Sequence, residues 1–171
     1  LLTPEVYSDR VDTYFAEIAS RVYLRYSDLL RESNALDFDD LLMETVALFS
    51  RYTEVAEKYQ HRFEHVLVDE FQDTNFAQYK LVEALALPQQ NIFAVGDPDQ
   101  SIYAFRGADY RNVVRFERTY PEARTILLEQ NYRSTQNILD AAMAVINHNP
   151  NRTPKHLFTD RGTGAPITLY E

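Results

Sequence analysis

The sequence predicts an α/β fold in which helices cover a parallel sheet. Two predicted strands, residues 63–68 with the apolar run 66–68 and residues 91–95, each lead into carboxylic acids, and a helical pattern lies between them. A continuous apolar run is typical of a strand that is buried on both faces of a parallel sheet. Because the connection between such strands is right-handed, both runs should place their acids at the same sheet edge. A third apolar run, residues 125–128, predicts another strand.

The N-terminal part of the chain predicts helices. Thr3 and Pro4 form a helix-start signal, with a capping residue followed by proline in the first turn. Apolar residues spaced by three and four positions then continue over residues 7–29 and define one helical face. We interpret this segment as one long helix or two helices that end near Glu32 and serve for packing.

Further helices are expected around the predicted strands. Acids in the first turn of the second helix are favoured by the helix dipole. Thr74 or Asn75 can cap the helix between the first two strands, since both side chains accept hydrogen bonds from free backbone N–H groups. The predicted helices cover residues 37–49, 51–62, 74–87, 112–119 and 134–147, and a last strand begins at residue 167.

Length and composition describe an ordinary globular protein. The 171 residues suffice for one domain with a core or for parts of two, and the missing cysteine excludes a disulfide framework. No signal peptide or membrane-length apolar run occurs, which predicts a cytoplasmic protein without a membrane partner. The net charge of −9 argues against a free-standing electrostatic nucleic-acid binder, but it permits binding by base stacking. The chain begins without methionine and ends inside an apparent strand, so we expect a piece of a longer protein.

Asp69 and Glu70 are the first candidates for chemistry. They directly follow the apolar residues 66–68, at the sheet edge where open α/β folds bind ligands. A phosphate-processing site needs such a pair, because one carboxylate helps to hold Mg²⁺ and its neighbour orients or deprotonates water. The alternative is a solvated turn or a cap for the next helix, and the pair alone leaves both interpretations open.

Several motifs together resemble a known family. They are DEFQD at residues 69–73, GDPDQSIYAFRGA at residues 96–108, NYRS at residues 131–134 and LDFDDL at residues 36–41. In sequence and order they resemble the UvrD/Rep/PcrA-type superfamily 1 ATP-dependent DNA helicases, over roughly residues 34–160. The resemblance implies a parallel-sheet P-loop NTPase (RecA-like) motor-domain fragment with a helical subdomain.

The same resemblance implies a function. Members of the family use ATP and Mg²⁺ as cofactors and couple ATP hydrolysis to translocation on single-stranded DNA and to duplex unwinding, in DNA repair or replication. The implied partners are single-stranded DNA and duplex junctions, and the oligomeric state stays open.

The resemblance also implies a role for each matching residue. Asp69 corresponds to the Mg²⁺-associated Walker B aspartate, and Glu70 corresponds to the glutamate that activates the hydrolytic water. The two together are the expected metal site. Gln100 corresponds to a glutamine that senses the γ-phosphate. Arg133 corresponds to an arginine that reaches the γ-phosphate from the second motor domain, and Tyr132 corresponds to a tyrosine that packs on the adenine ring.

Two aromatic residues correspond to the single-stranded DNA track. Tyr103 and Phe105 match these positions, and the second is often Trp in the family. Phe keeps a face for base stacking but has less area and no N–H donor. Core filling is the alternative for these two aromatics, and a surface salt bridge is the alternative for Arg133. For the acids at residues 37–40, a plain helix start is the better interpretation.

One family motif is missing from the chain. The sequence contains no Gly-x-x-x-x-Gly-Lys-Ser/Thr loop and only four glycines, so the P-loop that cradles phosphates is absent from these residues. The resemblance places that loop upstream, and we expect the isolated chain to be inactive. We expect residues 1–34 to be the helical end of an inserted subdomain, 35–124 the C-terminal half of the first motor domain and 125–171 the start of the second.

Two other functions are alternatives to the helicase: a metal-dependent nuclease and a non-catalytic interaction module. A metal-dependent nuclease would use Asp69, Glu70, Asp73 and Asp97, since clustered acids can bind two metal ions. That hypothesis leaves the glutamine of the second motif and the Tyr-Arg pair of the third unexplained. The other rival is a non-catalytic interaction module that uses the same fold, which ATPase activity of the full-length protein would dismiss.

Overall fold

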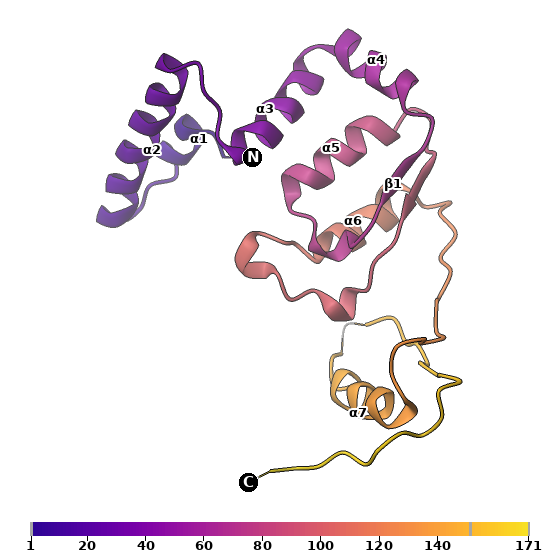
Figure 1. Cartoon of the computed structure of the whole chain (residues 1–171). Helices are drawn as coiled ribbons and strands as arrows, with labels where there is room; N and C mark the ends of the chain where they lie inside the picture. The colour runs from indigo at the N-terminus through magenta and orange to yellow at the C-terminus, as the bar shows by residue number, and fades with distance from the viewer. Residues whose placement is uncertain (1, 151, 171) are drawn as a thin grey trace.

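The computed structural model describes residues 2–150 and 152–170, and its centre is a small parallel sheet packed against helices (Figure 1). β1 (Val66–Val68) pairs in parallel with β2 (Ile92–Ala94), and α5 (Phe76–Ala86) forms the crossover between them. The predicted strand–helix–strand unit is therefore confirmed, although both strands are shorter than the predicted ranges 63–68 and 91–95. Both strands end where the acidic motifs begin.

Local signals account for the helices beside the sheet. α3 (Phe38–Arg51) begins at Asp37, whose carboxylate accepts the Asp40 N–H at 2.8 Å in a reciprocal capping box. Asn75 caps α5 in the same way. α4 (Thr53–Arg62) follows α3 after a single residue, and α6 (Arg111–Thr119) packs on the loop that follows β1. The buried apolar residues are Val46, Phe49, Ala56, Phe71, Tyr79, Ala86, Tyr120 and Leu139.

The two N-terminal helices stand apart from the sheet. α1 (Pro4–Ser8) packs on α2 (Tyr14–Glu32), and the pair extends away from the rest of the protein (Figure 1). Two helices rather than one long helix therefore form over this segment. The predicted packing role is only partly realised, because Phe15 and Val22 on the apolar face of α2 remain largely exposed.

The C-terminal part corrects two strand predictions. Residues 125–128 and 167–170 form no strand, and the three apolar side chains of residues 126–128 are exposed. A strand needs a hydrogen-bonded neighbour, and no described residue pairs with either segment. In this C-terminal part, Gln130 and Phe158 form an isolated parallel β-bridge. The helix of this part is α7 (Gln136–Ile146).

Short 3₁₀ helices shape the loops after the strands. η1 (Phe71–Asp73) follows β1, and η2 (Pro98–Gln100) and η3 (Ala104–Arg106) follow β2. The described residues contain no helix long and apolar enough to cross a membrane.

A buried asparagine fixes these loops to α6. Asn112 is fully buried, and its amide donates hydrogen bonds to the backbone oxygens of Thr74 at 2.8 Å and Asn75 at 3.3 Å. The Asp109 N–H also donates to the Thr74 oxygen at 3.1 Å. Buried polar groups are normally hydrogen-bonded, and here these bonds hold the loop after β1 against the loop after β2.

Asp109 should stabilise the start of α6 in a pH-dependent way. Hydrogen bonds from Arg111 at 2.7 Å and Arg115 at 2.8 Å lower its pKa to about 2 from the usual 3.8. A lowered pKa stabilises the fold above pH 4, and this contribution disappears as the pH falls toward 2. We expect Asp109→Asn to lower the free energy of unfolding by about 1–2 kcal/mol at pH 7, since one partner is exposed.

Urea denaturation of the 171-residue chain at pH 7, 4 and 2.5 measures this effect. Asp28→Asn is the matched control, because Asp28 pairs with Arg31 on an exposed helix surface and should contribute little. The difference between wild type and Asp109→Asn should shrink toward low pH. A difference that stays constant with pH would contradict an electrostatic role of Asp109.

Candidate functional site

Asp69 and Glu70 lie at the carboxyl edge of the sheet, directly after β1. The Glu70 N–H donates to the Asp69 carboxylate at 2.9 Å, and both side chains are exposed. Glu70 has a left-handed backbone with φ 48° and ψ 44°. This conformation costs a non-glycine residue on the order of 1–3 kcal/mol and is enriched at functional sites, although Asn34 and Gln90 also have a positive φ. The chain therefore turns sharply at the residue that the sequence singles out for catalysis.

Gln72 connects this turn to the loop after β2. Its side-chain amide donates to the Glu70 carboxylate at 2.8 Å, and its amide oxygen accepts the Asp97 N–H at 2.9 Å. The Asp97 carboxylate in turn accepts a hydrogen bond from the Gln100 amide at 2.8 Å. Glu70 and Gln100 are thus joined through two intervening residues, although each side chain is itself exposed.

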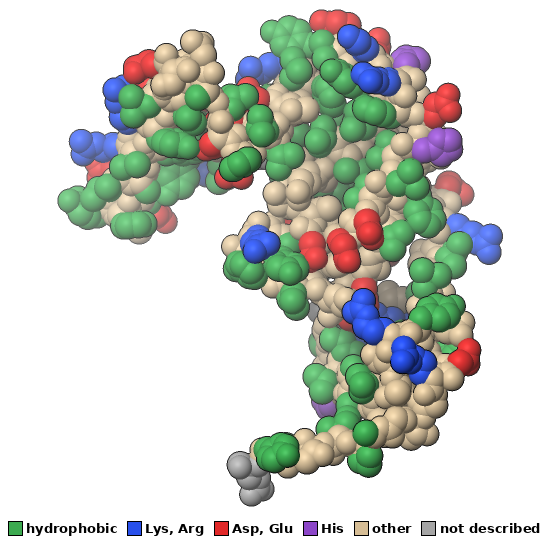
Figure 2. Space-filling view, viewed as in Figure 1, with side chains coloured by type: hydrophobic (Ala, Val, Ile, Leu, Met, Phe, Trp, Pro, Cys, Tyr) green, Lys and Arg blue, Asp and Glu red, His purple; other side chains and the backbone are tan. Residues whose placement is uncertain are grey.

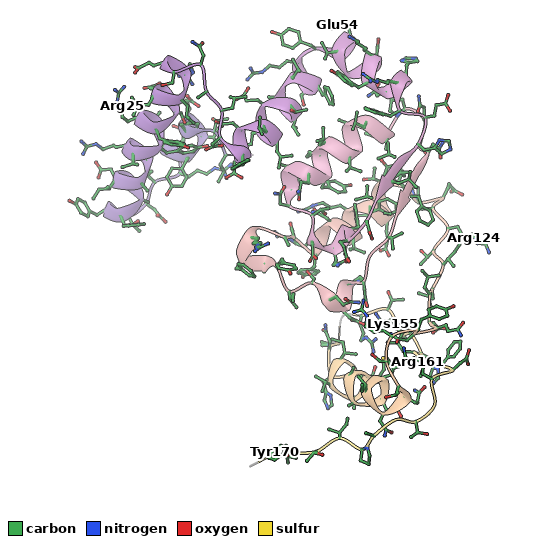
Figure 3. All side chains as sticks on the ribbon, viewed as in Figure 1. Arg25, Glu54, Arg124, Lys155, Arg161 and Tyr170 are labelled. Carbon is green, nitrogen blue, oxygen red and sulfur yellow. The ribbon has the colours of Figure 1, made fainter. Side chains whose placement is uncertain are left out.

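Asp97 and Asp99 also hold the C-terminal part of the protein. Lys155 donates to both carboxylates, at 2.9 Å to Asp99, and Arg152 pairs with Asp99 at 2.8 Å. Lys155 lies where the two parts meet (Figure 3). Burial alone would raise the pKa of Asp97, but hydrogen bonds from Lys155 and Gln100 outweigh burial and lower it. The loop after β2 therefore carries negative charge, and basic side chains of the same chain pair with its carboxylates.

Tyr103 and Phe105 form an exposed aromatic cluster with Arg106. Their ring centroids lie 5.8 Å apart, and the Arg106 guanidinium lies 5.2 Å from the Tyr103 ring and 5.5 Å from the Phe105 ring. Phe105 is 77% exposed, so core filling does not account for it. Exposed aromatic faces beside an arginine are suited to stacking with bases and contacting phosphates.

Tyr132 and Arg133 lie in the C-terminal part, after the connecting segment. Tyr132 is 75% exposed and donates its hydroxyl to Gln130 at 2.9 Å. The Arg133 N–H donates to the Asn131 side chain at 3.0 Å, which shapes the turn before α7. Among the described residues, the Arg133 guanidinium makes no ion pair, and no hydrogen bond or ion pair joins Tyr132 or Arg133 to the acidic loops. The surface salt bridge considered for Arg133 is not found among the described residues.

The acids suit a single carboxylate-bound cation better than a two-metal centre. Within residues 2–150 and 152–170, no group of three or more acidic, histidine or cysteine side chains could hold a metal ion. Asp73 and Asp97, which the nuclease hypothesis needs beside Asp69 and Glu70, are bound instead to Gln72 and Lys155. Asp69 keeps one carboxylate oxygen without a partner in the described chain, which fits Mg²⁺, since Mg²⁺ commonly uses one or two protein carboxylates plus substrate phosphates. Figure 2 shows acidic side chains in the middle of one face, with basic side chains below them.

Comparison with known families decides the affiliation of this chain. Residues 1–121 match the UvrD/REP helicase N-terminal domain. The chain belongs to the UvrD/REP helicase family. Residues 126–171 match the UvrD-like helicase C-terminal domain, so nearly the whole chain is covered by UvrD-type matches.

Individual UvrD/REP-type relatives are similar over almost all of the chain. The ATP-dependent DNA helicase PcrA of Leuconostoc citreum is 52% identical over 170 residues, which cover 99% of this chain and 23% of the relative. PcrA of Bacillus subtilis is 51% identical with the same coverage. The ATP-dependent DNA helicase UvrD1 of Mycobacterium tuberculosis is 55% identical over 162 residues, 91% of this chain and 21% of the relative. The chain thus spans about a quarter of the length of these UvrD/REP-type relatives.

Three residues of the candidate site could not be predicted from the sequence: Gln72, Arg152 and Lys155. Gln72 stands within a recognised motif, but nothing in its spacing indicates that its side chain is buried. Arg152 and Lys155 lie in a turn-rich linker that reads as a surface loop. The sequence offers one weak indication of their role, because two basic residues stand close together in a chain with an excess of acids.

Proposed function

We propose that the full-length protein containing this chain couples ATP hydrolysis to movement along single-stranded DNA and to duplex unwinding. One observation carries the proposal: the hydrogen-bonded path from Glu70 through Gln72 to Asp97 and Gln100. The loop that follows this path ends in the exposed cluster of Tyr103, Phe105 and Arg106. Hydrolysis and strand binding would therefore use two loops that are joined by side-chain hydrogen bonds. The names of the relatives support the same activity.

The proposed chemistry transfers the γ-phosphoryl group of ATP to water. The water oxygen forms a bond to the γ-phosphorus, the bond to the bridging oxygen of ADP breaks, and Glu70 accepts the water proton. Asp69 would hold Mg²⁺, which when bound neutralises charge on the phosphates. Arg133 supplies a fixed planar cation for the γ-phosphate, Gln100 contacts the γ-phosphate without adding charge, and Tyr132 packs on the adenine.

We further propose that the chain contains parts of three units within a P-loop NTPase motor. Residues 1–34 would be the helical end of an inserted subdomain, 35–124 the C-terminal half of the first motor domain and 125–171 the start of the second. Two features support this division: the separation of α1 and α2 from the sheet, and the irregular segment that precedes α7. ATP would bind between the two motor domains.

Titrations of full-length variants with single-stranded DNA and with nucleotide test which residues bind DNA and which bind ATP. Phe105→Ala should weaken single-stranded DNA binding by about 1–3 kcal/mol, because one base–aromatic stack is lost, and should change ATP affinity little. Tyr132→Ala should weaken nucleotide binding and leave DNA affinity nearly unchanged. Gln100→Ala should keep both ligands and lose much of the stimulation of ATPase activity by DNA.

Two exposed neighbours provide controls for these titrations. Ile102→Ala removes an exposed apolar side chain beside the aromatic cluster that has no stacking face, and Tyr110→Ala removes an exposed tyrosine outside it. Both should leave the two affinities within about twofold, since neither removes a proposed stack. Equal losses of DNA and nucleotide affinity in Phe105→Ala and Tyr132→Ala would defeat the proposal.

A further inference from the structure

Gln72 is a fully buried amide with a complete set of polar partners. It is 1% exposed, and its amide nitrogen donates to Glu70 at 2.8 Å and lies 3.4 Å from the Asp73 carboxylate. Its oxygen accepts the Asp97 N–H at 2.9 Å. A backbone donor on one side and two carboxylates on the other leave one orientation of the amide that satisfies every group.

The backbone just after β2, at Gly96, leaves room for this side chain. A Cβ atom added to Gly96 would lie 2.6 Å from the Gln72 oxygen and 3.2 Å from the Phe71 backbone nitrogen. Only glycine permits the chain to pass this close without displacing Gln72. The Gln72 amide is therefore held by backbone on its oxygen side, and its N–H group points at the exposed carboxylate of Glu70.

We infer that Gln72 is a positioning residue that holds the Glu70 carboxylate and ties it to the loop carrying Gln100. Glu70 has a long exposed side chain, and its other carboxylate oxygen has no hydrogen-bond partner in the described part of the chain. Fixing one oxygen leaves the other in a defined place to take a proton from water. A general base acts only within hydrogen-bond reach of that proton. This inference rests on the proposed role of Glu70 in ATP hydrolysis.

Gln72→Met in the full-length protein tests the inference. Methionine has nearly the same length and fills the buried space, but it cannot donate to Glu70. We expect kcat for ATP to fall by about tenfold to a hundredfold, the equivalent of one hydrogen bond to a charged group, with KM for ATP within about twofold. In Gln72→Asn the amide is one methylene too short to reach Glu70, so kcat should again fall while KM for ATP stays nearly unchanged. This variant replaces Gln72→Met if the methionine variant folds poorly.

Gln78→Met is the matched control. Gln78 is a half-buried glutamine in the same region, and its side chain accepts the Asn75 N–H at 2.8 Å at the start of α5. Its replacement removes a helix cap and should lower thermal stability, while kcat should stay within about twofold. A fall in kcat as large as that of Gln72→Met would show that loss of structure, rather than loss of positioning, is responsible.

A double-mutant cycle with Glu70→Gln gives the decisive measurement. If Gln72 acts through Glu70, adding Gln72→Met to Glu70→Gln should change single-turnover hydrolysis by less than about twofold, since the group it positions is already gone. Multiplicative effects of the two substitutions would overturn the positioning role while leaving the proposed role of Glu70 intact. Normal turnover in Glu70→Gln alone would overturn the role of Glu70 and the inference together.

Discussion

Glu70→Gln in the full-length protein is expected to lower ATP turnover by about two to four orders of magnitude, the usual contribution of a general base. Glutamine keeps the shape of the side chain and can still contact Gln72, but it cannot accept a proton from water. ATP affinity should stay nearly unchanged, because the side chain lies beside the proposed path of the water and not among the phosphate-binding groups. Steady-state ATPase assays with nucleotide titrations measure the two quantities separately.

Asp69→Asn separates the role of the metal from the role of the base. Loss of a charged Mg²⁺ ligand should weaken Mg²⁺-dependent nucleotide binding, whereas Glu70→Gln should not. Glu64→Gln is a suitable control, since Glu64 is an exposed acid that precedes β1 at the opposite end of the strand. Near-normal turnover in Glu70→Gln would remove Glu70 from the mechanism, whatever the behaviour of Asp69→Asn.

The purified 171-residue chain is expected to show no ATP hydrolysis and no DNA unwinding. Backbone N–H groups of a glycine-rich loop and its lysine normally supply most contacts to the phosphates, and the sequence contains no such loop. The carboxylates at the ends of β1 and β2 can complete a phosphate site but cannot build one by themselves. Phosphate release with and without single-stranded DNA measures this activity.

The same chain with Glu70→Gln controls for contaminating ATPases. Equal background rates in the two preparations would agree with an inactive chain. DNA-stimulated phosphate release that is lost in the Glu70→Gln chain would contradict the prediction, because it would mean that these residues suffice for hydrolysis.

Features determined by neighbouring residues could be predicted from the sequence. The helix starts at Asp37 and Asn75 follow from side chains that reach a backbone N–H three residues away. The parallel pairing of β1 and β2 follows from two apolar runs and the helix between them. The acidic loops then have to lie at one edge of the sheet, which is why Glu70 and Asp97 are linked through Gln72.

Features that depend on distant residues could not be predicted in this way. Residues 125–128 have the composition of a strand, but a strand also requires a neighbour, and none of the described residues provides one. Arg152 meets Asp99 from 53 positions away, and Lys155 meets Asp97 from 58 positions away. Nothing in the linker sequence indicates which acids these cations select. Gln72 contacts a backbone N–H 25 positions away, which no local pattern encodes.

The charged contact between the two parts of the protein affects the free energy that separating them would cost. Arg152 and Asp99 are about one-tenth exposed, so each gives up much of its hydration when the parts meet. On separation, water solvates these ions again and offsets much of the attraction that is lost. An apolar interface has no such compensation, because separating it exposes apolar surface to water. A contact made of ions can therefore open and close repeatedly at small net free-energy cost.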